Sequence, residues 1–188
     1  MKFRSLEIPG AYLLEPERST DRHGFFARNF CRDELEERGL DPALVRCEVS
    51  VNRRSGTVQG MHYQGAPYEA VRLVRCTAGA VYVVIVDLRH DSPAYRRHVG
   101  VELCPAKRQS LYVPAGVGHG FQTLEDETEV FFQTSEMHYP ECERGVRWND
   151  PALAIEWPRE ITEISDRDQS FPDLVPPKAV APERRVEA

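Results

Sequence analysis

The chain has 188 residues, 41% of them hydrophobic, which suits one globular domain with a hydrophobic core rather than two. Its formal net charge is −6 and no basic cluster is long enough to follow a phosphate backbone, so nucleic acid is not an expected partner. No stretch approaches the roughly 20 apolar residues of a membrane span, and the N-terminus interrupts its apolar residues with glutamate and proline, unlike a signal peptide.

The cysteine content points to a reducing compartment. The five cysteines are an odd number, form no CxxC pair and lack the spacing of a zinc site; they are Cys31, Cys47, Cys76, Cys104 and Cys142. We therefore expect a cytoplasmic protein whose cysteines are mostly reduced, some of them as small core residues. A catalytic cysteine is the less favoured alternative.

In chain order, the first expected element is a short charged helix over residues 33–40, which Gly39 would end. Strand-like runs of β-branched or alternating residues follow, separated by turn residues, at 70–76, 80–89, 98–104, 110–116 and 128–139. The run over 80–88 has too few polar residues to face water on one side, so it is expected between two layers. This spacing predicts an all-β sandwich or jelly roll with a few short peripheral helices.

The C-terminal part of the sequence changes character. Residues 158–174 are mixed and predict a short extended or helical cap, whereas residues 175–188 are rich in proline and charge and predict a disordered tail. The predicted domain therefore covers residues 1–174.

Two histidines stand out because each follows a glycine at the edge of an apolar run: His62 in "QGMHYQ" and His119 in "VPAGVGHGF". Taken alone, each is more often a hydrogen-bonded core or turn residue than a catalyst. A histidine, with an ordinary pKa near ~6.5, is nonetheless the best general base at neutral pH, especially when a carboxylate orients its ring. Asp166 and Asp168 are the candidate carboxylates.

No metal or other cofactor is expected. A cupin-type metal site needs two histidines in an HxH-like cluster with a carboxylate and a third histidine, whereas here each strand-like run has one histidine. Neither a glycine-rich phosphate loop nor a GxSxG elbow is present.

Five segments, in order and at the expected distances, resemble the dTDP-4-dehydrorhamnose 3,5-epimerase family of metal-free cupins. They are "GTVQGMHYQ", "RLVRCTAGAVYVVIVDLRHDSPAY", "LYVPAGVGHGFQTLEDETEV", "ERGVRWNDPALAIEWP" and "ISDRDQSFPDL". The resemblance runs from Pro9 to Leu174. It implies a cupin jelly roll, membership of a homodimer in which strands cross between subunits, and an isomerase of deoxysugar biosynthesis that epimerises a nucleotide-linked 4-keto-6-deoxyhexose.

The resemblance also implies roles for particular residues. His62 corresponds to the base that removes a proton beside the ketone, and Asp168 to its partner. Arg72 stands where the family has a lysine and would stabilise the enolate, although arginine is bulkier and planar. His119 would line the sugar pocket, and Glu143, in the "ERG" segment, is a further expected substrate-binding residue.

Several pocket positions depart from the family. Phe132 stands where the family has its proton-donating tyrosine, and loss of a positioned acid typically costs about 10²–10⁴ in rate. Gln59 and His23 replace two arginines expected to grip the diphosphate. Arg28 replaces a glutamate and is a cation available to compensate, while Phe26 is retained to stack on a base.

Three functions stay open from the sequence. The first is the epimerase, with water or another group replacing the tyrosine and inversion restricted to one carbon. The second is a related isomerase that uses His62 and Asp168 on a different carbonyl substrate. The third is a non-catalytic ligand-binding cupin, which Phe132 favours and the retained pair of His62 and Asp168 opposes.

Overall fold

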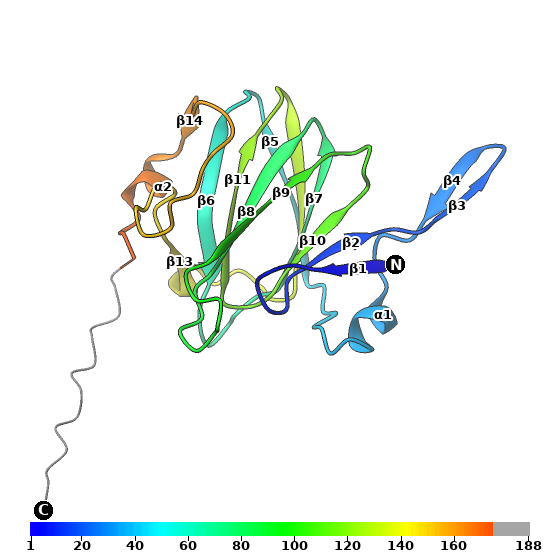
Figure 1. Cartoon of the computed structure of the whole chain (residues 1–188), viewed down its shortest axis with the longest axis horizontal. Coiled ribbons are helices and arrows are strands. Elements are labelled where there is room, and N and C mark those ends of the chain that lie inside the picture. The colour runs from blue at the N-terminus through cyan, green and yellow to red at the C-terminus, as the bar shows by residue number, and fades with distance from the viewer. Residues whose placement is uncertain (175–188) are drawn as a thin grey trace, which may run out of the picture.

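Two facing β-sheets make up most of the computed structural model, which describes residues 1–174 (Figure 1). The first sheet has six strands in the spatial order β1 (Lys2–Ser5), β2 (Tyr12–Glu15), β10 (Ser110–Val113), β7 (Arg72–Ala78), β12 (Thr128–Thr134) and β5 (Arg46–Asn52). The second has the order β13 (Glu143–Gly145), β6 (Thr57–Gln64), β11 (Val117–Thr123), β8 (Val81–Asp87) and β9 (His98–Leu103), with β14 (Glu163–Ile164) pairing parallel to β6.

The main core fills the space between the sheets, because alternate side chains of each strand point inward. Val74 and Val130 from the first sheet meet Val83 and Phe121 from the second, and all four are at most 2% exposed. Burying a side chain of this size contributes about 1.5–3 kcal/mol. The two sheets therefore hold together chiefly through apolar contact.

Strand β8 is buried on both of its faces, as its apolar run predicts. Val83 and Ile85 belong to the core between the sheets, whereas Val84 and Val86 point the other way into a second apolar cluster that includes Leu153. The chain after β13 supplies much of this second cover. It ends in β14 and the short helix α2 (Asp166–Ser170), which lie along the outer side of β6 (Figure 1).

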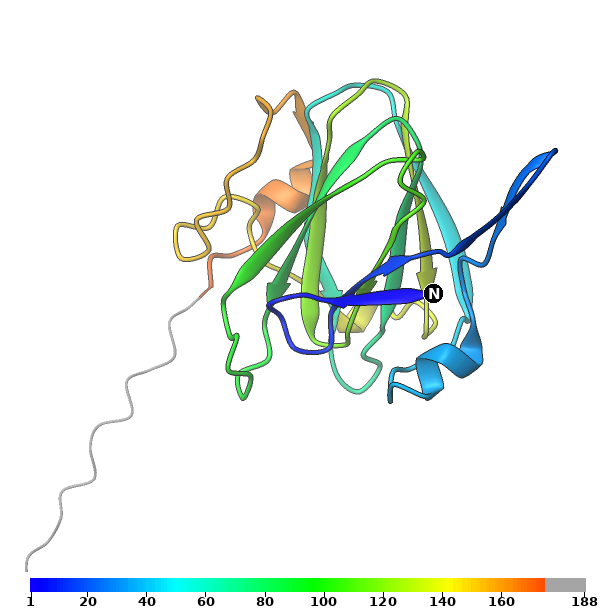
Figure 2. The same cartoon turned by 45° about the vertical axis from the view of Figure 1, so that its right-hand side comes forward.

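The N-terminal part carries a hairpin that stands apart from both sheets. Strands β3 (Arg18–Asp21) and β4 (Gly24–Ala27) pair only with each other among the described residues, and both views show them projecting from the body (Figures 1 and 2). We call residues 18–27 the arm. Helix α1 (Arg32–Glu36) follows it.

The structure confirms the all-β fold predicted from the sequence and adjusts several boundaries. Helix α1 ends at Glu36, and tight turns then lead to Gly39, whose φ of +68° favours glycine. The strand expected over 128–139 stops at Thr134. The N-terminal strands, β5, β11, β13 and β14 were not among the predicted runs; β11 begins within the glycine-rich segment 116–120, which its sequence suggests as a turn. The predicted tail, 175–188, lies outside the described residues.

Candidate active site

A cavity of about 130 Å³ lies between the two sheets, where the core residue Phe121 forms part of its wall. Residues from five strands line it, and among them are five of the residues predicted from the sequence: Gln59, His62, Arg72, His119 and Phe132. The fold thus brings together side chains from β6, β7, β11 and β12.

The orientation of His62 depends on an irregularity in β6. His119 pairs with His62 and Phe121 pairs with Gln59, so three steps along β6 match two along β11. In a regular strand, residues 59 and 62 would point to opposite faces, because side chains alternate. The β-bulge adds one residue between them and so turns His62 to the same face as Gln59. Both Gln59 and His62 therefore reach the same cavity.

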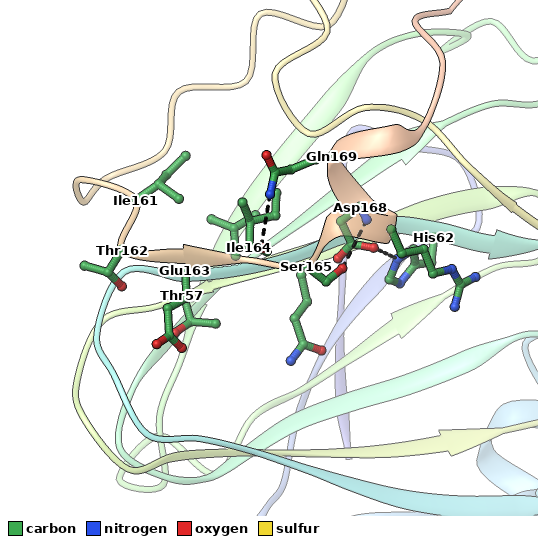
Figure 3. A pocket seen from close by; sticks show the side chains of 12 residues that line it. Thr57, His62, Ile161, Thr162, Glu163, Ile164, Ser165, Asp168 and Gln169 are labelled. Atoms are coloured by element: carbon green, nitrogen blue, oxygen red, sulfur yellow. Dashed lines mark hydrogen bonds and ion pairs between the residues drawn. The ribbon is translucent and has the colours of Figure 1, made fainter.

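His62 and Asp168 form a hydrogen-bonded pair. The His62 Nε2 lies 2.7 Å from Asp168 Oδ1 (Figure 3). The second oxygen, Oδ2, accepts a hydrogen bond from the backbone N–H of Gly60 at 3.0 Å. An ionised carboxylate accepts only, so Nε2 carries the proton and donates. Nδ1 of His62 is left with its lone pair, and no hydrogen bond of residues 1–174 occupies it. The pair has the geometry of a base with its orienting carboxylate.

The backbone of α2 holds Asp168 in place. Ser165 precedes the helix, and its Oγ accepts a hydrogen bond from the Asp168 N–H at 3.0 Å, which is an N-cap. Asp168 is 3% exposed. Burial alone would raise the pKa of this carboxyl, but the hydrogen bonds from His62 and the Gly60 N–H outweigh it, and the net pKa is lowered. Asp168 therefore stays ionised beside His62.

His119 is held neutral between two partners. The guanidinium of Arg72 has only donors, and its Nη1 lies 3.0 Å from His119 Nε2, so Nε2 accepts. The proton is then on Nδ1, which donates to the carbonyl oxygen of His62 at 2.9 Å. Burial, and after it the charge of Arg72, lower the pKa of His119 well below its usual value. His119 thus orients Arg72 and contributes no charge.

Arg72 supplies the positive charge of the cavity. Burial lowers the pKa of its guanidinium, and the carboxylates of Glu143 and Glu48 act against that effect. An arginine begins so high on the pH scale that it remains protonated. A fixed cation in a small buried cavity is a means of stabilising a negative charge that develops there.

Phe132 forms part of the apolar wall of the cavity. Its ring stands edge-on to His119, with centroids 5.9 Å apart, and lies 6.1 Å from the ring of Phe121. A phenyl ring has no proton to donate, so this wall offers no acid at position 132.

A second, larger hollow of about 770 Å³ shares two lining residues, Gln59 and His62, with the inner cavity. It continues along β14 and α2, where Ser165, Arg167 and Asp168 line it (Figure 3). Arg167 is half exposed, and its Nη2 lies 2.5 Å from Glu143 Oε1. The inner cavity and the outer hollow together offer room for a ligand longer than a single sugar.

Five predicted residues do not line the inner cavity of their own chain, and one of them, Asp168, lines the outer hollow beside His62 instead. His23 and Phe26 lie on the arm, where Phe26 is 77% exposed, and Arg28 follows it with Nη1 3.2 Å from Glu34 Oε1. Glu143 is paired with Arg167 at the edge of the outer hollow.

Gln59 lines the cavity, but its amide group is already engaged. The amide N–H group donates hydrogen bonds to Asn52 Oδ1 at 2.8 Å and to Ser50 Oγ at 3.2 Å.

Three further residues of the cavity were missed from the sequence: the core residue Phe121 and two polar residues. Glu48 and Thr134 both line it, from β5 and β12. The alternation in "RCEVSVN" is the signal for Glu48, because it places Arg46, Glu48, Ser50 and Asn52 on one face of a strand. Residues 1–174 contain no cluster of three or more His, Cys, Asp or Glu side chains able to hold a metal ion. In the same part of the chain no helix is long and apolar enough to cross a membrane.

Comparison with known proteins gives one consistent result. The profile of the family described as dTDP-4-dehydrorhamnose 3,5-epimerase matches residues 5–175. A protein of that name from Sinorhizobium fredii is 38% identical over 175 residues, which are 93% of this chain and 90% of that protein. The dTDP-4-dehydrorhamnose 3-epimerase of Streptomyces niveus is 36% identical over 170 residues, 90% of this chain and 82% of that one.

The solved structures agree. The crystal structure of dTDP-4-dehydrorhamnose 3,5-epimerase from Elizabethkingia anophelis superposes with a TM-score of 0.89 at 29% identity, covering 92% of this chain and 96% of that chain.

Proposed function

The chain belongs to the dTDP-4-dehydrorhamnose 3,5-epimerase family, a family of isomerases, and from that premise we propose that it epimerises a nucleotide-linked 4-keto-6-deoxyhexose. The observation that carries the proposal is the hydrogen-bonded pair of His62 and Asp168, in which the His62 ring lines the same cavity as the cation of Arg72. These are a base, its orienting carboxylate and a charge for the enolate.

The reaction begins at the carbon next to the ketone, whose proton is acidic. His62 Nδ1 removes this proton, and Asp168 stabilises the imidazolium that forms. The electrons of the broken C–H bond become the enolate, whose oxygen carries the negative charge. Arg72, already fixed against neutral His119, stabilises that charge without having to reorganise.

Phe132 limits how the enolate can be reprotonated. The side chain can pack against a sugar but cannot return a proton, so we propose that inversion occurs at one carbon only. The similar protein from Streptomyces niveus, named as a 3-epimerase, supports action at a single carbon within this family.

The diphosphate end of the substrate is proposed to occupy the outer hollow. Arg167 is the cation that lines it, and charge-assisted hydrogen bonds from a guanidinium suit phosphate oxygens. Phe26 on the arm and Arg28 just after it are proposed to reach this end from a second copy in a homodimer, because β3 and β4 project from the body on the side away from β6 of their own chain (Figure 1).

A second candidate is an isomerase acting on a carbonyl compound without a nucleotide. The amide of Gln59, which is neutral and occupied by Ser50 and Asn52, favours it because a diphosphate gains no charge there. Isothermal titration with dTDP separates the two candidates. Saturable binding that weakens in Arg167→Ala supports the nucleotide sugar, and absence of heat favours the alternative.

The proposed function is tested by incubating the protein with dTDP-4-keto-6-deoxyglucose in D₂O and following the protons at C3 and C5 by NMR. We expect deuterium to enter one carbon. His62→Ala should lower that rate by about 10²–10⁴-fold, because it removes the base. Exchange that persists in His62→Ala would contradict the assignment of the base.

Phe132→Tyr is the informative companion variant. A phenol on this wall adds a proton donor, so we expect deuterium at a second carbon or a faster reaction at the first. Exchange at both carbons in the unmodified protein would show that Phe132 does not restrict the reaction.

A further inference from the structure

Glu48 is the one carboxylate that lines the inner cavity within residues 1–174, and the reaction described above gives it no role. It lies on β5, directly opposite Phe132 of β12 in the antiparallel register. Directly paired residues of neighbouring antiparallel strands point to the same face. Phe132 faces His119 across the cavity, so Glu48 faces the cavity as well.

Glu48 and His62 come from different sheets. His62 belongs to β6 of the second sheet, whereas β5 and β12 belong to the first, and the cavity lies between them. A sugar ring placed in that cavity has the imidazole on one side and the carboxyl group on the other. Inversion at a carbon needs this arrangement, because the proton leaves from one face and returns from the opposite one.

The surroundings of Glu48 suit proton exchange. One oxygen, Oε2, is held 2.9 Å from Arg46 Nη2, and the side chain is 51% exposed, so solvent can reload it with a proton. The other charged or titratable groups of the cavity wall are His62, Arg72 and neutral His119. Glu48 is thus open to solvent on one side and to the cavity on the other, as a group that passes a proton from solvent into the cavity must be.

We propose that Glu48 returns the proton to the enolate from the wall opposite His62, and this inference rests on the proposed function. His62 Nδ1 takes the proton from the carbon beside the ketone, and the C–H electrons form the enolate. The O–H bond of Glu48 then breaks, its proton bonds to the same carbon from the other face, and its electrons return to the carboxylate. His62 afterwards releases a proton to solvent and Glu48 takes one up, so protons balance over the cycle.

The test separates exchange from inversion. Unmodified protein, Glu48→Gln and the matched control Glu129→Gln are incubated with dTDP-4-keto-6-deoxyglucose in D₂O. NMR then measures deuterium in the starting epimer and formation of the inverted one. Glu129 is on β12 in the same sheet and bonds Thr77 outside the cavity, so its variant tests for general effects of losing a carboxylate.

In Glu48→Gln, His62 can still remove a proton and return deuterium to the same face. We therefore expect deuterium in the starting epimer to persist while inversion falls by about 10²-fold or more, with both rates unchanged in Glu129→Gln. Inversion at the unmodified rate in Glu48→Gln would overturn the inference, and so would parallel loss of exchange and inversion. If the unmodified protein shows no exchange at all, the proposed function itself fails, and the inference falls with it.

Discussion

At the scale of single residues, the site depends on two side chains that lie 106 positions apart in the sequence, His62 and Asp168. Asp168 is fixed from two sides: the Gly60 N–H, near His62, donates to its carboxylate, and the Ser165 Oγ accepts a hydrogen bond from its own N–H. The carboxylate serves both the chemistry and the attachment of α2 to β6.

The ionisation of Asp168 therefore contributes to stability in a pH-dependent way. Its pKa is lower in the folded chain than its usual value, so its contribution is fully present above the unfolded pKa of about 3.9 and is lost as pH falls through the folded pKa. We expect the free energy of unfolding to fall less steeply between about pH 5 and 3 in Asp168→Asn than in the unmodified protein.

Urea unfolding at several pH values measures this, with Asp166→Asn as the control because that side chain is exposed on the same helix. Equal slopes for the two variants would show that the environment of Asp168 does not set the acid dependence.

At the scale of the elements, the site depends on how closely β6 and β11 approach. Gly60 has a φ of +116°, and a Cβ there would lie 2.5 Å from the Gly120 Cα and 2.9 Å from the carbonyl oxygen of His119. Both are backbone atoms that cannot turn aside. The bulge that aims His62 into the cavity thus requires glycine at this point.

Gly60→Ala should lower the free energy of unfolding by about 2–4 kcal/mol, from backbone strain and from the forced separation of the two strands. Gly39→Ala is the matched control, since Gly39 also has a positive φ of +68° but nothing lies within 4 Å of its added Cβ. Its cost should be limited to the strain, about 1–2 kcal/mol. Urea midpoints at one fixed protein concentration compare them, and equal losses would argue against close packing at Gly60.

At the scale of the whole molecule, the arm is the feature whose strands pair with neither sheet, although Arg18 at its base donates a hydrogen bond to the carbonyl oxygen of Ala106. It exposes Phe25 by 43% and Phe26 by 77%, and it projects from the body in both views (Figure 2). Exposed aromatic residues that lie together commonly mark an interaction surface. A second copy is the occupant that the proposed function requires.

Sedimentation equilibrium should therefore show a dimer at micromolar concentration. Phe26→Asp should weaken the dimer at least about tenfold, because a charge replaces an aromatic contact at the interface. Thr20→Ala on the same arm is expected to leave the assembly unchanged. A monomer at these concentrations would contradict the proposed role of the arm residues in substrate binding, because they could not reach the site of their own chain.

The all-β fold, the burial of β8 on both faces and the chemical types of the main site residues could be predicted from the sequence. Strand periodicity is a local property of the sequence. The segments that contain His62, His119 and Asp168 occur in the order and at the distances expected for the family, which can likewise be seen in the sequence. The sequence could not show that His62 points inward, because the bulge breaks the alternation on which such a prediction depends. Nor could it show that Glu48 faces the cavity, since that follows from the pairing of β5 with β12 across distant segments. The neutral state of His119 likewise arises only when folding buries it against Arg72. The identity of the reactive residues can be seen in local segments of the sequence. Tertiary packing decides that their side chains face one another across two sheets, because those segments are far apart along the chain.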